Sequence, residues 1–464
     1  MRILLISPGS PASFVYQPPL GPAYILSYLR ENGFPESAFF DRYHAGEADL
    51  RRTLQRQPPR LVGIQCQTPT RHLALRLARI VKEERPEARV VFGGVHATFL
   101  SRQLLEHYGE VDYVVRGEGE APMLDLARRV EAGEDADGVA NVAFRKGGAV
   151  VENPLRPPIE DLDRLPFPAY FEHAVDEDGV HKKTGAILTA RGCGAACHYC
   201  SVPNFWGRPR LRSPGNVVDE IEHLVRNHGV QYVRIVDDTF TADQDRAKRI
   251  CEEMLRRGLR VQWRCATRAD CVSKELLDLM ARAGCIRVSY GVESGSPKIL
   301  QAIHKNVSPL EVEQAVRWSR DAGMIIETCF MVGNRGESQE TIDESRALIR
   351  RLRPEEYCVS AAVYLFPGTP LYRYAEKQGF VDETVWLRDE PVIPYTAEQP
   401  LSQLAEWQAQ LMRELGMARG FWHYLAHVVR VARHTPLRRL PRAAYHFVRT
   451  NLLSLFSKSG GKCI

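Results

Sequence analysis

The 464-residue sequence has no run of about 18 apolar residues, so it predicts no membrane-spanning helix. Its start lacks an apolar stretch long enough for a secretory signal, and residues 2–7 are typical of a short buried strand instead. The expected location is therefore the cytoplasm. Low-complexity segments are also absent, and a hydrophobic content of 44% with 26% charged residues is typical of globular proteins. At roughly 150 residues per domain, the length suggests about three structural units.

Acidic residues are missing from the last 50 positions. Residues 415–464 contain nine Lys and Arg but no Asp or Glu, and the whole chain has a net charge of +5. The rest of the chain is therefore mildly acidic, which argues against a nucleic-acid groove through the active site. Aromatic and leucine residues alternate with the basic ones, which predicts peripheral contact with an anionic membrane surface. The alternative is a helical cap packed on the protein with a solvated basic face.

Three of the eleven cysteines lie close together, at Cys193, Cys197 and Cys200. Cysteines of a cytosolic chain are reduced, so a tight group is more typical of metal binding than of disulfides. Three thiolates leave one iron of a four-iron cubane without a protein ligand, and that open iron can bind a substrate. The alternative is zinc with a distant fourth ligand such as His198. Zinc sites favour paired C-x2-C units, and no second pair exists here.

The segment Arg-Gly-Cys-Gly-Ala-Ala-Cys-His-Tyr-Cys at 191–200 resembles the signature of the radical S-adenosylmethionine (radical SAM) superfamily. The resemblance implies a [4Fe–4S] cluster that binds S-adenosyl-L-methionine through its open iron. It further implies cleavage of that molecule to methionine and a 5′-deoxyadenosyl radical, driven by an external electron donor such as a flavodoxin or ferredoxin. By the same resemblance Tyr199 packs on the adenine. The alternative for Tyr199 is ordinary loop packing.

Apolar stretches at 186–190, 232–237, 261–267, 286–291, 325–332 and 359–366 predict six strands separated by helices. Six βα units in series fit a partial (β/α)6 barrel over residues 186–375. Within it, residues 289–295 look like the superfamily's fourth-strand segment, which implies cofactor contacts from Gly291, Glu293 and Ser294. A carboxylate suits a ribose diol because it can accept two hydrogen bonds. Asp237 and Asp238 end the second strand, and either line the substrate side or are ordinary polar strand ends.

Residues 333–337, Gly-Asn-Arg-Gly-Glu, match the superfamily's turn after the fifth strand. The match is incomplete, because Asn334 and Arg335 stand where a proline-containing pair is usual. The departure leaves the expected barrel unchanged.

Residues 1–135 alternate short apolar runs with helical patterns, which predicts an open parallel sheet covered by helices on both faces. Ligands of such Rossmann-like sheets bind at the carboxyl ends of the strands. The glycine-rich segments found there resemble the cobalamin-binding domain fused to one branch of the radical SAM superfamily. The implied cobalamin contacts are Ser7, Gln65, Thr68, Gly93, Gly94, His96, Thr98, Gly117, Glu118 and Glu120.

The Asp-x-His-x-x-Gly element that supplies a cobalt ligand in other cobalamin proteins is missing. Residues 41–46 only imitate it, with one residue too many between Asp41 and His44. We therefore expect bound cobalamin to have no histidine on its cobalt. His96 is the nearest candidate to the ring, and the alternative for it is a hydrogen-bonded core residue.

The expected organisation is a cobalamin-binding-like domain at 1–135, a hairpin and proline-rich linker at 136–185, the barrel at 186–375, and a helical, basic region at 376–464. The predicted function is cobalamin-dependent C-methylation of an unactivated carbon on a hydrophobic, lipid-like or natural-product small molecule. The same motifs allow oxidative cyclisation or ring contraction of a tetrapyrrole or hopanoid-like lipid. An alternative without catalysis is a cobalamin-binding sensor, but the intact three-cysteine loop argues against it.

Overall fold

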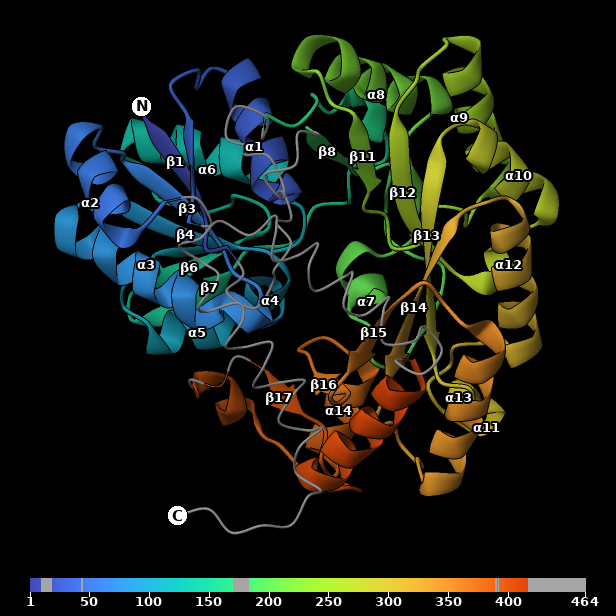
Figure 1. Ribbon diagram of the computed structural model, residues 1–464. Coiled ribbons are helices and arrows are strands. Elements are labelled where there is room, and N and C mark those ends of the chain that lie inside the picture. Colours follow the sequence, from blue (N-terminus) through green and yellow to red (C-terminus); the bar gives the residue numbers. More distant parts are fainter. Residues whose placement is uncertain (10–18, 43–44, 170–182, 389, 391, 416–464) are drawn as a thin grey trace, which may run out of the picture.

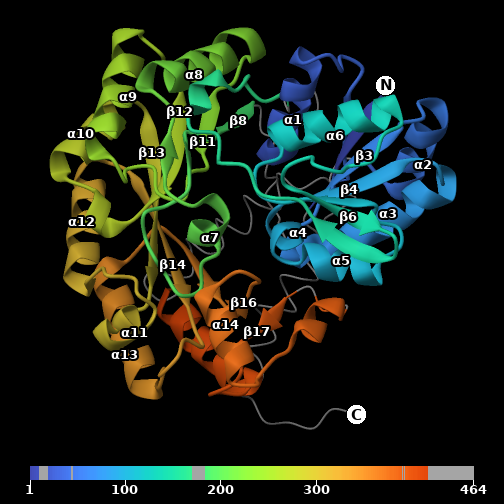
Figure 2. The same cartoon turned by 180° about the vertical axis from the view of Figure 1, so that it is seen from behind.

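The computed structural model describes residues 1–9, 19–42, 45–169, 183–388, 390 and 392–415. These residues form two α/β domains side by side, with the segment that follows the second domain lying against both (Figure 1). The view from behind shows the same arrangement (Figure 2). Within the described residues, no helix combines the length and the apolar character needed to cross a membrane. The basic residues beyond 415 and their expected membrane contact lie outside the described residues.

The first domain is built on a seven-stranded sheet in the order β2-β1-β3-β4-β5-β6-β7. Its first five strands are parallel. In chain order these are β1 (Ile3–Ser7), β2 (Ala38–Asp41), β3 (Leu61–Gln65), β4 (Arg89–Gly93) and β5 (Tyr113–Val115). The open parallel sheet expected from the sequence is confirmed. Strand β2 was not expected.

Helices cover both faces of this sheet, as expected. One apolar core joins it to α2 (Glu47–Arg56), α3 (Arg71–Glu84) and α5 (Ser101–His107). The other joins it to α1 (Leu20–Glu31) and α6 (Glu120–Ala132). Because both faces are buried, the strands are mostly apolar, as in β1, where all five residues are buried and only Ser7 is polar.

The expected hairpin forms strands β6 (Val142–Lys146) and β7 (Ala149–Glu152). These strands pair antiparallel with β5 and with each other, so the hairpin extends the sheet of the first domain. By strand pairing, the first domain therefore continues to Glu152, and the linker begins after it.

The second domain contains six parallel strands in the order β15-β14-β13-β12-β11-β8. They are β8 (Thr184–Ile187), β11 (Tyr232–Ile235), β12 (Gln262–Thr267), β13 (Cys285–Glu293), β14 (Ile325–Met331) and β15 (Glu356–Ser360). The connecting helices are α8 (Pro214–His228), α9 (Gln244–Arg256), α10 (Lys274–Arg282), α12 (Pro309–Asp321) and α13 (Gln339–Leu352). Strands β8 and β15 are the two edges of this sheet, so the partial (β/α)6 barrel is confirmed.

The sixth strand lies earlier than the sequence predicted. It covers Glu356–Ser360 rather than 359–366, because the chain turns after Ser360, whose hydroxyl donates to the Ala362 carbonyl at 2.5 Å. The later apolar residues form β16 (Tyr364–Leu365), which pairs with β17 (Ile393–Pro394) in a separate small sheet. With α14 (Pro370–Lys377) and the short helix η5 (Glu383–Leu387), this sheet begins the C-terminal segment.

Side chains of the barrel strands alternate between two faces. In β13, Val288, Tyr290 and Val292 belong to the core beneath the outer helices. The residues between them, Ser289 and Gly291, therefore face the interior of the barrel. This interior opens at the carboxyl ends of the strands, where sites of such barrels lie.

Candidate active site and cofactor sites

The three predicted cluster ligands lie on the loop that follows β9 (Ala190–Arg191). Cys197 is buried, whereas Cys193 and Cys200 are half-buried. Asp237 anchors the start of this loop: it accepts hydrogen bonds from the Thr189 N–H at 2.6 Å, the Ala190 N–H at 3.3 Å and the Thr189 hydroxyl. Burial raises the pKa of Asp237. Asp237 therefore positions the loop rather than lining the substrate side.

Two side chains from neighbouring strands approach the cysteine sulfurs. The Thr239 hydroxyl lies 3.4 Å from Cys193 Sγ, and an Arg268 guanidinium N–H points to Cys197 Sγ at 3.9 Å. The third thiol, Cys200, has a pKa of about 11, raised mainly by burial and further by Asp238, Cys197 and Cys193. The three thiols are thus close enough to interact electrostatically.

The three cysteines could bind either a [4Fe–4S] cluster or a zinc ion, and their arrangement distinguishes the two. Among the described residues, no three His, Cys, Asp or Glu side chains converge as the ligands of a single metal ion would. A cubane binds each cysteine through a different iron, so its ligand sulfurs need not converge. Three thiols on one loop therefore fit a [4Fe–4S] cluster with one open iron better than tetrahedral zinc.

Three predicted S-adenosylmethionine contacts meet beside this loop. Glu293, at the end of β13, accepts hydrogen bonds from the Tyr199 hydroxyl and from Lys305 Nζ, each at 3.0 Å. Glu293 has a φ of +67°. Its carboxylate lies beside Gly291: a Cβ there would be 2.6 Å from Glu293 Oε1 and 3.0 Å from Lys305 Nζ, so a larger residue would displace this ion pair. Lys305 was missed because nothing in its own sequence context marks it.

Ser294 lies apart from this group. It is buried and its hydroxyl lies 3.2 Å from the Ser345 hydroxyl on α13. The same hydroxyl accepts from the Ser296 N–H. These contacts of Ser294 fix the turn after β13. A contact from Ser294 to the cofactor stays a prediction.

The predicted cobalamin residues gather at the carboxyl edge of the first sheet, after β1, β3, β4 and β5. Gly94 has a φ of +105°, and a Cβ there would lie 3.0 Å from the Cys66 carbonyl. Thr98 joins two of the glycine segments, because its hydroxyl donates to the Gly94 carbonyl and accepts from the Gly117 N–H, both at 2.9 Å. The glycine segments have no side chains that would block a large flat ligand, so their backbone can approach it closely. This edge of the sheet therefore fits a corrin.

His96 is a buried, hydrogen-bonded residue. Its side chain is almost fully enclosed, its Nδ1 lies 3.1 Å from the Thr68 hydroxyl, and its ring packs edge-on against Trp386 of η5. Burial lowers the pKa of His96 to about 3, so the ring is neutral. Arg71 secures the same contact by donating to the Trp386 and Arg388 carbonyls at 3.1 and 2.7 Å. The C-terminal segment is thus hydrogen-bonded to the carboxyl edge of the first sheet. His44, the other histidine considered from the sequence, lies outside the described residues.

Glu118 and Glu120 bind the barrel. Arg191, two residues before the first cluster cysteine, pairs with Glu118 at 2.5 Å and also with Glu120. Arg210 donates to the same Glu118 oxygen at 2.8 Å. All four side chains are largely buried, and for the two glutamates cobalamin contact stays a prediction beside this observed role.

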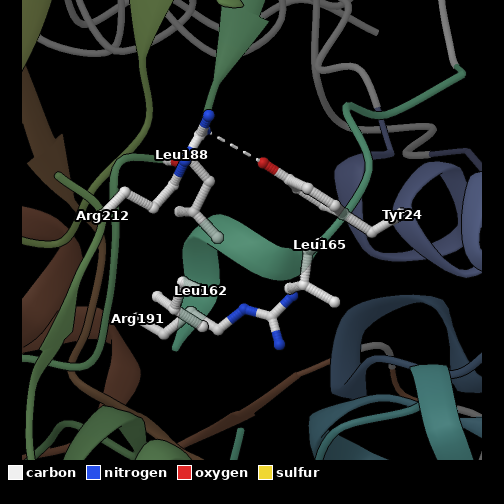
Figure 3. A pocket seen from close by; sticks show the side chains of 6 residues that line it. All are labelled: Tyr24, Leu162, Leu165, Leu188, Arg191 and Arg212. Atoms are coloured by element: carbon white, nitrogen blue, oxygen red, sulfur yellow. Dashed lines mark hydrogen bonds between the residues drawn. The ribbon is translucent and has the colours of Figure 1, made fainter. Parts of the chain in front are cut away.

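We call Arg191, Arg210, Glu118 and Glu120 the interdomain ion cluster. Burial alone lowers the pKa of Arg191, but Glu120 and Glu118 together raise it above its ordinary value, so the side chain stays charged. A small pocket adjoins the cluster and is lined by Tyr24, Leu162, Leu165, Leu188, Arg191 and Arg212 (Figure 3). Its mostly apolar wall and its place between the domains make it part of the joint.

Comparison with known proteins agrees with both halves of this geometry. Residues 187–349 match the radical SAM superfamily, and residues 13–127 match the B12 binding domain. The chain is 34% identical over 369 residues to the anaerobic magnesium-protoporphyrin IX monomethyl ester cyclase of Rubrivivax gelatinosus, covering 76% of this chain and 66% of the cyclase. It is 28% identical over 431 residues to an uncharacterized methyltransferase of Pyrococcus horikoshii, covering 89% of this chain and 90% of that protein.

Solved structures share the fold across both domains. The radical S-adenosylmethionine methyltransferase TsrM from Kitasatospora setae, with cobalamin and a [4Fe–4S] cluster bound, superimposes with a TM-score of 0.70 at 21% identity, covering 90% of this chain and 89% of TsrM. The cobalamin-dependent radical enzyme OxsB gives a TM-score of 0.75 at 17% identity, covering 97% of this chain and 70% of OxsB. The cofactors of this chain are accordingly a [4Fe–4S] cluster, S-adenosylmethionine and cobalamin. The chain belongs to the cobalamin-binding branch of the radical SAM superfamily.

Proposed function

We propose that the protein methylates an unactivated carbon of a hydrophobic or natural-product small molecule. The observation that carries this proposal is the buried joint between the two cofactor domains: Arg191, beside the cluster loop, binds two carboxylates of the cobalamin domain. In such a pair, S-adenosylmethionine on the cluster supplies a carbon-centred radical and cobalamin supplies the methyl group. Transfer between two cofactors needs a fixed geometry, which a buried ion cluster provides.

The chain's own residues bind and orient S-adenosylmethionine. Cys193, Cys197 and Cys200 would hold the cluster, and the Glu293 carboxylate is placed to accept hydrogen bonds from a ribose. Tyr199 and Lys305 both donate to Oε1 of that carboxylate and so fix its position. Because Lys305 and Glu293 are both largely buried, the pair is weakly screened and keeps its orientation.

A second candidate is radical cyclisation or rearrangement of a tetrapyrrole. It is favoured by the 34% identity with the magnesium-protoporphyrin cyclase. Both candidates need the same cofactors and differ in the product.

Product mass separates the two. The anaerobically reconstituted protein is incubated with S-adenosylmethionine deuterated in its methyl group, and separately with magnesium-protoporphyrin IX monomethyl ester and with a hopanoid. Transfer of the labelled methyl group to either compound supports methylation. Loss of hydrogen from the porphyrin without label supports cyclisation. Absence of 5′-deoxyadenosine in every incubation contradicts both.

Bound cobalamin is expected to have no histidine nitrogen on its cobalt. His96, the nearest described candidate, is buried, lies within hydrogen-bond distance of the Thr68 hydroxyl and packs against the Trp386 ring. Electron paramagnetic resonance of the reduced cob(II)alamin form measures this directly. Free cobalamin titrated with imidazole serves as the control spectrum. Nitrogen superhyperfine splitting from a protein histidine would contradict the prediction.

Removing the Arg268 side chain is expected to lower the reduction potential of the cluster. Hydrogen bonds and positive charge at the ligand sulfurs stabilise the more negative, reduced cluster. Arg268→Gln should shift the midpoint downward in a redox titration followed by electron paramagnetic resonance. Arg256→Gln, on the exposed side of α9, is the matched control and should leave it unchanged. An unaltered midpoint in Arg268→Gln would show that this contact does not tune the cluster.

We further propose two partners. A flavodoxin or ferredoxin would supply the electron that opens S-adenosylmethionine, as the resemblance to the radical SAM superfamily implies. An anionic membrane surface would attract the basic residues beyond 415, which supports a lipid-like substrate and a peripheral location at the inner face of the membrane.

A further inference from the structure

Two thiols lie side by side inside the barrel and have no part in cluster binding. Cys329 on β14 is in register with Cys358 on β15, and both are free. The two thiols are close enough to perturb each other: Cys358 raises the pKa of Cys329, and Cys329 lowers that of Cys358 to about 7. Cys358 is exposed and Cys329 is half-buried. Their sequence neighbours Phe330 and Val359 belong to the core beneath the outer helices, so the two thiols are on the opposite face, toward the barrel interior.

This thiol pair lies next to the residues expected to bind S-adenosylmethionine. Gly291 on β13 is the register partner of Cys329, so Gly291, Cys329 and Cys358 form one row across three strands. Glu293 acts electrostatically on both thiols. Met331, two residues after Cys329 on the same face, packs in the same apolar clusters as Tyr199. The row therefore lies near Tyr199 of the cluster loop and near the carboxylate predicted to bind the cofactor.

We propose that Cys329 and Cys358 form a hydrogen-atom-donating dithiol that quenches carbon-centred radicals in the barrel. The proposal rests on the radical chemistry of the proposed function. An S–H bond is weaker than the C–H bond that a primary carbon radical forms, so transfer of a hydrogen atom from sulfur to carbon is downhill. A neighbouring thiol then captures the sulfur radical, which a single cysteine cannot do.

Atoms and electrons balance when the quenched radical is the 5′-deoxyadenosyl radical derived from S-adenosylmethionine. The sulfonium C–S bond breaks, the hydrogen atom of one thiol moves to the 5′ carbon, and the two sulfurs join. One thiol, one thiolate and one S-adenosylmethionine thus give a disulfide, methionine and 5′-deoxyadenosine. The electron that opens the sulfonium equals the one released when the S–S bond forms. With a substrate radical, the same thiol returns the hydrogen atom to the substrate carbon.

The chain contains a matched pair on the other face of the same sheet. Cys285 on β13 raises the pKa of Cys265 on β12, so these two thiols are also neighbours, and both are buried in the core beneath the outer helices. They share the chemistry of the first pair but not its access to the interior. They therefore separate the effect of position from the effect of a thiol pair.

The test uses the reconstituted full-length holoenzyme in deuterated water, without substrate and without any added thiol. S-adenosylmethionine is cleaved with titanium(III) citrate, and 5′-deoxyadenosine is analysed by mass spectrometry. Thiol hydrogens exchange with solvent, so donation from the pair places one solvent deuterium in the product. Cys329→Ser with Cys358→Ser keeps an exchangeable hydrogen, but an O–H bond is too strong to donate it. This double variant should lose the deuterium and still form 5′-deoxyadenosine, whereas Cys265→Ser should retain the deuterium.

Each result has one meaning. Deuterium lost only in the double variant supports the dithiol. Wild-type product without solvent deuterium, or deuterium unchanged in the double variant, overturns the dithiol and leaves the proposed function standing. No 5′-deoxyadenosine from the wild-type protein overturns both. Iron content of each variant shows whether the barrel and cluster are intact.

Discussion

Replacing Cys200 with alanine is expected to abolish the [4Fe–4S] cluster, because the two remaining thiolates cannot hold a cubane. The Cys200 side chain is half-buried on a loop, so its truncation costs little packing. The expected result is loss of protein-bound iron and sulfide, loss of the visible absorption of the cluster, and no 5′-deoxyadenosine. The same outcome is expected at Cys193 and Cys197.

The matched control is Cys251→Ala. Cys251 is fully buried in the barrel core and lies on α9, away from the cluster loop. Its loss leaves a small cavity that costs about 1 kcal/mol, but every cluster ligand is retained. Full iron content and unchanged 5′-deoxyadenosine formation in Cys200→Ala would show that the cluster has other ligands.

Sequence patterns predict those parts of this molecule whose structure is determined by residues close together in the chain. The cluster loop holds its three ligands within eight residues, so its spacing indicates a metal or iron–sulfur site, and its resemblance to the radical SAM signature implies the cofactor chemistry. The barrel strands alternate with amphipathic helices, and capping residues such as Ser213, Asp243 and Ser308 mark where helices begin. Four of the six predicted barrel strands overlap the observed ones over most of their length for this reason, whereas the first, predicted at 186–190, lies at Thr184–Ile187.

The sixth strand and strand β2 show where local patterns fail. Residues 359–366 contain enough apolar side chains for a strand, but the turn after Ser360 divides them between two sheets. Strand β2 is only four residues long, too short for a clear alternation. In both cases pairing with a distant strand decides the structure, and a local pattern carries no information about that partner.

Contacts between distant residues were the least predictable part of the site. Lys305 reaches Glu293 across a helix and a turn, and Arg71 binds carbonyls of a segment more than 300 residues away. Glu118 and Glu120 follow a strand as cofactor residues do, yet their observed partner is Arg191. A carboxylate at a strand end can bind a ligand or another domain, and only the packed structure identifies its partner.

Arg191→Met is the second variant expected to have a large effect. Methionine has a similar length but no charge. Glu118 would keep its ion pair with Arg210 and its hydrogen bond from the Ile159 N–H, whereas Glu120 would lose the described ion pair that it makes with Arg191. Removing one partner of a buried ion pair typically costs about 3–5 kcal/mol, because the other charge stays buried and unpaired. Stacking of the guanidinium over Tyr24 and Trp206 would also be lost. We therefore expect a marked loss of resistance to denaturant in the apo-protein.

Stability alone does not establish that Arg191 positions the cofactors, so the decisive measurement is magnetic. In the reduced protein, the coupling between the cluster and cob(II)alamin reports their separation, and Arg191→Met should weaken or broaden it even in samples with full cofactor content. Adding Glu120→Gln to Arg191→Met removes the unpaired charge and should recover part of the stability without restoring the coupling. Arg208→Met, which removes an exposed ion pair with Glu160, is the matched control and should change neither property. If the coupling in Arg191→Met equals that of the wild-type protein, the interdomain ion cluster contributes to folding only, and other contacts fix the two cofactors relative to each other.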